Sequence, residues 1–83
     1  MLKELREYLK NNAEIENDDS KSHFPNITYF CELKTEIPEI EAIINAKKAR
    51  IKNVDAHVEK VKYNEVFYYR INIYGSWLYG WNN

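Results

Sequence analysis

The segment from Val66 to Tyr74 alternates its side chains with a period of two, and this alternation limits what the chain can fold into. Successive side chains of an extended strand point to opposite faces of a sheet. One face would carry the large apolar residues Phe67, Tyr69, Ile71 and Ile73. The other face would carry Val66, Tyr68, Arg70, Asn72 and Tyr74. The pattern predicts a strand with one buried and one outer face.

The residues before this strand supply a partner for it. A turn at residues 64–65 places Val58 opposite Ile71 on the apolar face and Glu59 opposite Arg70 on the outer face. Opposite charges that face each other across two strands are mildly stabilising. A slip of one residue would lose both matches, because it would move every side chain to the other face. The sequence therefore predicts a hairpin with this register.

A continuous helix is the alternative for residues 51–62. Ile51, Val54, Val58 and Val61 recur there at a three-four spacing that is also typical of a helix. The strand is preferred because Val54, Ala56 and Val58 also alternate, and because both faces of the hairpin then match.

Three further elements are predicted upstream. Residues 1–16 place leucines at helical spacing with charged residues between them, which is typical of an amphipathic helix, and residues 17–25 are polar and predict a loop. Residues 26–34 alternate as a strand. Thr35 can cap a second helix that runs to about residue 50, with Pro38 tolerated in its first turn.

These elements predict a single small α+β domain that spans residues 1–83, in the order α-β-α-β-β. The last strand is the most apolar and is placed between the other two, which gives a three-stranded sheet of order 1-3-2 with two helices on one face. The domain consists of a helix (1–16), a loop (17–25), a βαββ core (26–75) and an aromatic tail (76–83). Its predicted buried residues are Leu5, Leu9, Tyr29, Cys31, Leu33, Ile40, Ile44, Val54, Val58, Phe67, Tyr69, Ile71 and Ile73.

No group of residues specifies a catalytic or metal-binding chemistry. Asp55, His57 and Glu59 share a strand face, but residues four apart on a strand lie about 13 Å apart, too far to share one ion. Cys31 could act as a nucleophile with a histidine. A lone cysteine on an apolar strand face is usually a small core residue. We therefore predict a protein that is not an enzyme and has no catalytic residue, metal or cofactor.

The single cysteine and the N-terminal sequence favour a cytoplasmic protein, and the balanced charge disfavours nucleic acid as its partner. The chain has 12 basic and 13 acidic residues, whereas nucleic-acid-binding domains are usually basic. A single cysteine allows no internal disulfide. Residues 1–12 contain no continuous apolar run, so neither a signal peptide nor a membrane span is predicted.

Aromatic residues concentrate at the C-terminal end, where residues 63–83 hold eight of the twelve in the chain. A small core does not need so many, and aromatic side chains often anchor interfaces. The tail could close the core or bind a partner. We expect a small protein-binding module that occludes a partner's surface, as inhibitors or accessory proteins of phages and mobile elements do. Its predicted partner-binding residues are Tyr68, Arg70, Tyr74, Trp77 and Trp81.

Two alternatives stay open. The outer sheet face could bind RNA or single-stranded DNA by stacking, with phosphate contacts from the basic cluster of Lys47, Lys48, Arg50 and Lys52. The same face could instead form a homodimer.

Residues 27–75 also resemble the first half of a SPOR domain. The resemblance rests on the helical segment 37–50, on Val54-Asp55-Ala56-His57-Val58, and on Tyr68-Tyr69-Arg70-Ile71-Asn72-Ile73-Tyr74-Gly75. Proteins of that family bind peptidoglycan glycans in the cell envelope. This chain has neither the family's glutamine-containing first strand nor its second helix and final strand.

Overall fold

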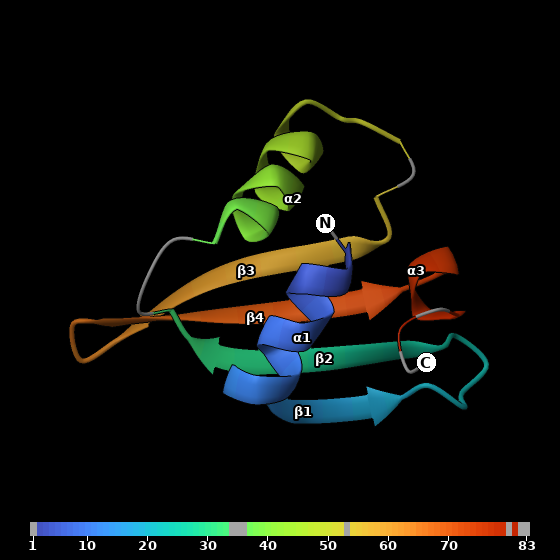
Figure 1. The fold of residues 1–83 in the computed structure, drawn as a ribbon, viewed down its shortest axis with the longest axis horizontal. Helices are drawn as coiled ribbons and strands as arrows, with labels where there is room; N and C mark the ends of the chain where they lie inside the picture. Colours follow the sequence, from blue (N-terminus) through green and yellow to red (C-terminus); the bar gives the residue numbers. More distant parts are fainter. Residues whose placement is uncertain (1, 34–36, 53, 80, 82–83) are drawn as a thin grey trace.

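The computed structural model of this chain describes residues 2–33, 37–52, 54–79 and 81. Its elements are α1 (Leu2–Asn12), β1 (Glu14–Asp19), β2 (Asn26–Glu32), α2 (Pro38–Lys48), β3 (Ala56–Tyr63), β4 (Val66–Tyr74) and α3 (Ser76–Tyr79). The strands form one antiparallel sheet in the order β1-β2-β4-β3, and α1 and α2 lie on one face of it (Figure 1). The predicted α+β class is confirmed.

The β3–β4 hairpin has the predicted register. Val58 pairs with Ile71 and Glu59 with Arg70, and β4 lies between β2 and β3. The turn is formed by Asn64 and Glu65 with φ angles of 49° and 67°. Two consecutive residues with positive φ are typical of the type I′ turn, whose twist suits a two-residue hairpin.

The prediction of three strands is wrong, because β1 adds a fourth at the edge of the sheet. β1 pairs with β2 and replaces the end of the predicted first helix and the start of the predicted loop. All six of its residues are exposed, and four of them are acidic. With no buried face, the strand has no apolar alternation from which it could be predicted. Its main-chain pairing with β2 places it, and its register shifts between Ile15 and Asn17.

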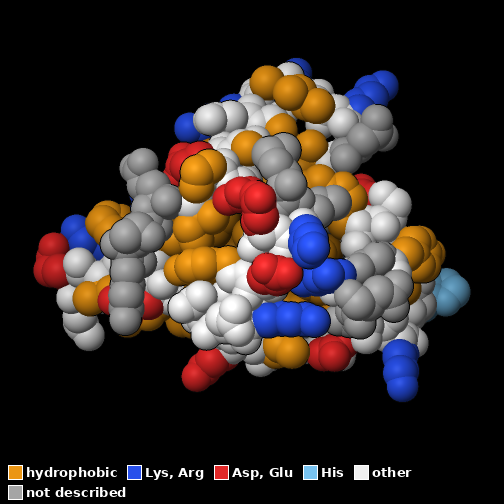
Figure 2. All heavy atoms as spheres, viewed as in Figure 1, with side chains coloured by type: hydrophobic (Ala, Val, Ile, Leu, Met, Phe, Trp, Pro, Cys, Tyr) orange, Lys and Arg blue, Asp and Glu red, His pale blue; other side chains and the backbone are white. Residues whose placement is uncertain are grey.

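Both long helices have an apolar face toward the sheet. α1 buries Leu5 and Leu9, while its charged side chains cover the middle of the molecule in Figure 2. α2 begins at Pro38, where the missing N–H is tolerated. Its N-cap position is held by Ile37 without a side-chain bond, whereas Thr35, the predicted cap, lies outside the described residues.

The core lies between the helices and one face of the sheet. Eight of the thirteen predicted core residues are buried, namely Leu5, Leu9, Tyr29, Cys31, Ile40, Tyr69, Ile71 and Ile73, and Leu33, Ile44, Val54 and Val58 are partly buried against them. Burial of Phe67 is the one wrong prediction, because its side chain is 43% exposed. It faces the helix side, but it lies at the hairpin end, which projects past both helices (Figure 1). The remaining core residues are Ile27, Ile37, Ile43, Ala56, Leu78 and Trp81.

Candidate functional site

The face of the sheet that is turned away from the helices is the candidate functional surface. α1 and α2 lie on the opposite side (Figure 1), and none of the residues on this face is fully buried. We call it the outer face and define it by the outward residues of β2, β3 and β4. These are Asn26, Thr28, Phe30 and Glu32 of β2, His57, Glu59, Val61 and Tyr63 of β3, and Val66, Tyr68, Arg70, Asn72 and Tyr74 of β4.

Three rings form a row across the hairpin half of this face. Phe30 stacks on Tyr68, with ring centroids 5.1 Å apart and planes inclined by 10°. Tyr63 lies against the same tyrosine at 5.9 Å and is 53% exposed. We call these residues the aromatic row. The rings restrict one another's motion before a partner binds. Less side-chain entropy is then lost on binding.

Arg70 is held beside the aromatic row by two carboxylates. Its Nε and Nη2 atoms donate to the two oxygens of Glu16 at 2.9 and 3.2 Å, and its Nη1 donates to Glu59 at 3.1 Å. Its guanidinium carbon also lies 5.6 Å from the centroid of the Phe30 ring. The side chain therefore links β1 to β3 across the sheet. The contribution of Glu16 was not predicted, because β1 itself was not.

The other half of the outer face is polar and bonded internally. The side-chain amide of Asn72 donates to the hydroxyl of Thr28 at 2.9 Å and to the side-chain oxygen of Asn26 at 3.1 Å. Tyr74 ends this half of the face and is 36% exposed. Together with Phe24 of the β1–β2 loop it borders a shallow depression. Tyr68, Arg70 and Tyr74 thus share one face, as predicted, but Tyr74 lies away from the aromatic row.

The two tryptophans of the tail lie on the other side of the sheet. Trp81 is 2% exposed, and its indole N–H donates to the phenolic oxygen of Tyr29 at 2.8 Å. Trp77 is partly buried against the core. In this conformation the tail closes the core, and neither ring adds to the outer face.

The four residues of the basic cluster are all exposed at the end of α2 and in the loop that follows it. Lys47 and Arg50 line a depression of about 230 Å³ together with Tyr74. The Lys47 ammonium also contacts Nδ1 of His57. Part of the basic cluster therefore lies next to one aromatic residue of the outer face, but at the far end from the aromatic row.

The described residues contain no group of three or more His, Cys, Asp or Glu side chains that could hold a metal ion. Asp55 bonds to Ser76, Glu59 bonds to Arg70 and His57 contacts Lys47, so the three residues weighed as a metal site make separate contacts. Cys31 is buried, and burial raises the pKa of its thiol, which disfavours the nucleophilic thiolate.

Among the described helices, none has the length and apolar content that crossing a membrane requires. Comparisons of the chain with protein-family models, with curated proteins and with solved structures found no match.

Proposed function

We propose that this chain is a small, non-enzymatic protein-binding module of the cytoplasm that occludes a surface of its partner through the outer face. Such a role would suit an inhibitor or an accessory protein of a phage or mobile element. The observation that carries the proposal is the aromatic row, which crosses β2, β4 and β3 with Tyr68 on the central strand β4 and with no helix of the described chain over it. Tyrosine and arginine are among the residue types that are enriched at the positions that dominate binding energy at interfaces.

The surroundings of Arg70 support the same proposal. A long side chain loses conformational freedom when it binds, and this loss weakens association. The bonds to Glu16 and Glu59 hold the guanidinium beside Phe30 before any partner arrives. The Arg70 side chain keeps about a third of its surface exposed, so it can still donate to a partner. Arg70 and the aromatic row would form the centre of the interface, with Tyr74 at its border.

The proposal is tested by isolating the partner and measuring its affinity for variants of the outer face. Replacing Tyr68, Arg70 and Tyr74 together with Ala should weaken binding at least tenfold, or about 1.4 kcal/mol. Replacing Tyr63 and Tyr68 should have a similar effect, because both belong to the aromatic row. Tyr79→Ala is the matched control, because Tyr79 is 82% exposed but lies on α3, outside the outer face.

Unchanged affinity in a folded, monomeric triple variant would refute the assignment of the outer face. Sizing chromatography of the parent chain and of the triple variant separates partner binding from the rival homodimer. If the parent is a dimer and the triple variant is a monomer, the outer face joins two copies of this chain.

Binding of RNA or single-stranded DNA is the second candidate. It is favoured by the position of Lys47 and Arg50 beside Tyr74, since phosphate contacts and base stacking could combine there. The net charge of −1 disfavours it. The ratio of absorbance at 260 and 280 nm in the purified protein detects bound nucleic acid. Charge reversal at Lys47 and Arg50 should abolish such binding and leave protein binding unchanged.

A further inference from the structure

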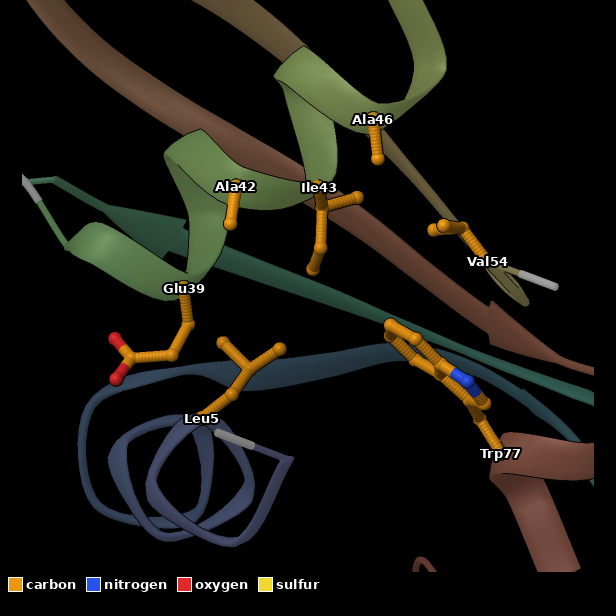
Figure 3. Close-up of a pocket in the computed structure, with 7 residues that line it drawn as sticks. All are labelled: Leu5, Glu39, Ala42, Ile43, Ala46, Val54 and Trp77. Atoms are coloured by element: carbon orange, nitrogen blue, oxygen red, sulfur yellow. The ribbon is translucent and has the colours of Figure 1, made fainter. Parts of the chain in front are cut away.

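A second candidate site lies on the helix side of the sheet, in a pocket lined by residues of α1, α2 and α3 and of the segment before β3. Its volume is about 380 Å³. Figure 3 shows Leu5 of α1 pointing across it toward α2, with the Trp77 ring of α3 at one end. The described residues that line it come from four separate segments of the chain and are Leu5, Glu39, Ala42, Ile43, Ala46, Val54 and Trp77.

Small side chains on α2 keep this pocket open. Ala42 and Ala46 are one helical turn apart and both face the pocket (Figure 3). Ile43 lies between them and also lines the pocket, whereas Ile40 of the same helix is fully buried in the core. A domain of 83 residues buries a smaller fraction of its surface on folding than a larger domain does, so an unfilled apolar space is a loss of stability. Natural proteins accept such losses where a site is needed for function.

The residues that line the pocket indicate the chemical class of ligand that it could bind. Apart from Glu39, the described lining residues are aliphatic or aromatic. The Glu39 carboxylate and the Trp77 indole lie at opposite ends of the pocket in Figure 3. Among the ion pairs found in the described part of the chain, none involves Glu39. A ligand with an apolar ring at one end and a positive charge at the other would match both ends.

We propose that this pocket binds a small aromatic amine, with its ring against Trp77 and its ammonium group near Glu39. The size is suitable, because a cavity of roughly 150 Å³ lined by apolar side chains binds benzene. A pocket of about 380 Å³ therefore has room for a body of two fused rings. A ring against the indole gains from offset or edge-to-face contact. This site is separate from the outer face, so the proposal does not depend on the proposed protein partner.

The amine naphthylethylamine and the acid naphthylacetate are suitable probes, because they share a ring system and differ in the sign of their charge. Titration of the full chain with each probe by calorimetry should show that the amine binds at least tenfold tighter. In two-dimensional NMR the amine should shift the indole N–H signal of Trp77. The indole signal of Trp81, which is buried and bonded to Tyr29, should stay unchanged as an internal control.

Two variants test the contacts. Ala46→Leu places a large side chain in the pocket and should abolish binding of the amine, with Ala42→Leu as a second version if the first does not fold. Ala49→Leu makes the same change at an exposed position just beyond the end of α2 and should leave binding unchanged. Glu39→Gln should bring the affinities for amine and acid close together.

Three results would overturn the proposal. The first is that neither probe binds the parent chain at millimolar concentration, in which case the pocket is a packing defect. The second is that the acid binds as tightly as the amine. The third is that both Leu variants fold and still bind the amine with parental affinity.

Discussion

The indole N–H of Trp81 donates a hydrogen bond of 2.8 Å to the phenolic oxygen of Tyr29, a residue 52 positions earlier in the chain. Both side chains are buried, with 2% and 4% of their surface exposed. Tyr29 lies on the helix side of β2, so the bond joins the C-terminal tail to the sheet. A buried indole N–H or phenol group usually has a hydrogen-bond partner. Here the Trp81 indole and the Tyr29 phenol are partners of each other.

Removal of the Tyr29 hydroxyl should therefore destabilise the domain. In Tyr29→Phe the ring stays in the core, but the buried N–H of Trp81 loses its acceptor. An unsatisfied buried donor costs about 1–3 kcal/mol. Chemical denaturation measures this change in unfolding free energy. Tyr79→Phe makes the same substitution at an exposed position and should change the stability by much less. Equal effects of the two substitutions would contradict the role given to the bond.

Ile71 should be among the most sensitive positions of the core. It is fully buried at the centre of β4 and pairs with Tyr29 on one side and Val58 on the other. Ile71→Ala should cost roughly 2–5 kcal/mol, because it leaves a cavity in a packed core. Thermal unfolding tests this, with the 60%-exposed Ile51→Ala as the control. A melting temperature within a few degrees of the parent would show that Ile71 is not central.

The strand β1 and the exposure of Phe67 differ from the predicted fold, and both depend on information that a local pattern of side chains does not contain. Sequence patterns report which side chains are buried, and they predicted the β3–β4 hairpin because both of its faces carry matching residues. β1 has no buried face and pairs with β2 through main-chain groups, so no pattern of side chains predicts this strand. Phe67 follows the pattern of a buried residue, but alternation cannot show where the helices that cover a face come to an end.

The same limit applies to the candidate site. Alternation placed Tyr68 and Arg70 on the outer face and paired Arg70 with Glu59. It could not find the contact with Glu16, because that contact depends on the unpredicted edge strand. The pocket beside Trp77 was also missed, since it results from the spacing of two helices and not from any local motif. Relations between distant elements need the three-dimensional structure.

The turn of the hairpin offers a stabilising substitution. Glu65 has a φ angle of 67°, which costs a residue with a side chain roughly 1–2 kcal/mol relative to right-handed geometry. Glycine adopts this conformation freely and is preferred after Asn in type I′ turns. Glu65→Gly should raise the unfolding free energy, although it also removes the exposed ion pair with Lys62 at 3.1 Å. Glu65→Gln removes only the ion pair and is the control. A lower stability for the glycine variant than for the glutamine variant would contradict the expectation.

Asp55 should make the free energy of unfolding depend on pH in the acidic range. Its carboxylate accepts bonds from the hydroxyl and the main-chain N–H of Ser76 at 2.5 and 2.7 Å, and these bonds lower its pKa in the folded state. The resulting stabilisation is complete above the pKa of an unfolded aspartate, near 4, and is lost as the pH falls through the lower folded value. NMR titration should show that the pKa rises in Ser76→Ala. An Asp55 pKa in the parent equal to that of a free aspartate would refute the effect.

Gly75 should tolerate no side chain while Asp55 is present. Its φ angle is 65°, and a Cβ atom there would lie 2.7 Å from a carboxylate oxygen of Asp55. Gly75→Ala therefore combines backbone strain of about 1–2 kcal/mol with a steric clash. The clash depends on Asp55, but the strain does not. In an Asp55→Ala background the glycine substitution should thus cost less than in the parent, because only the strain remains. A double-mutant cycle measured by denaturation gives the difference, and contacting residues typically couple by about 0.5–3 kcal/mol. If the costs of Gly75→Ala and Asp55→Ala were strictly additive, the Asp55 side chain would be able to move away freely. The close packing of Gly75 against Asp55 would then not constrain the start of α3.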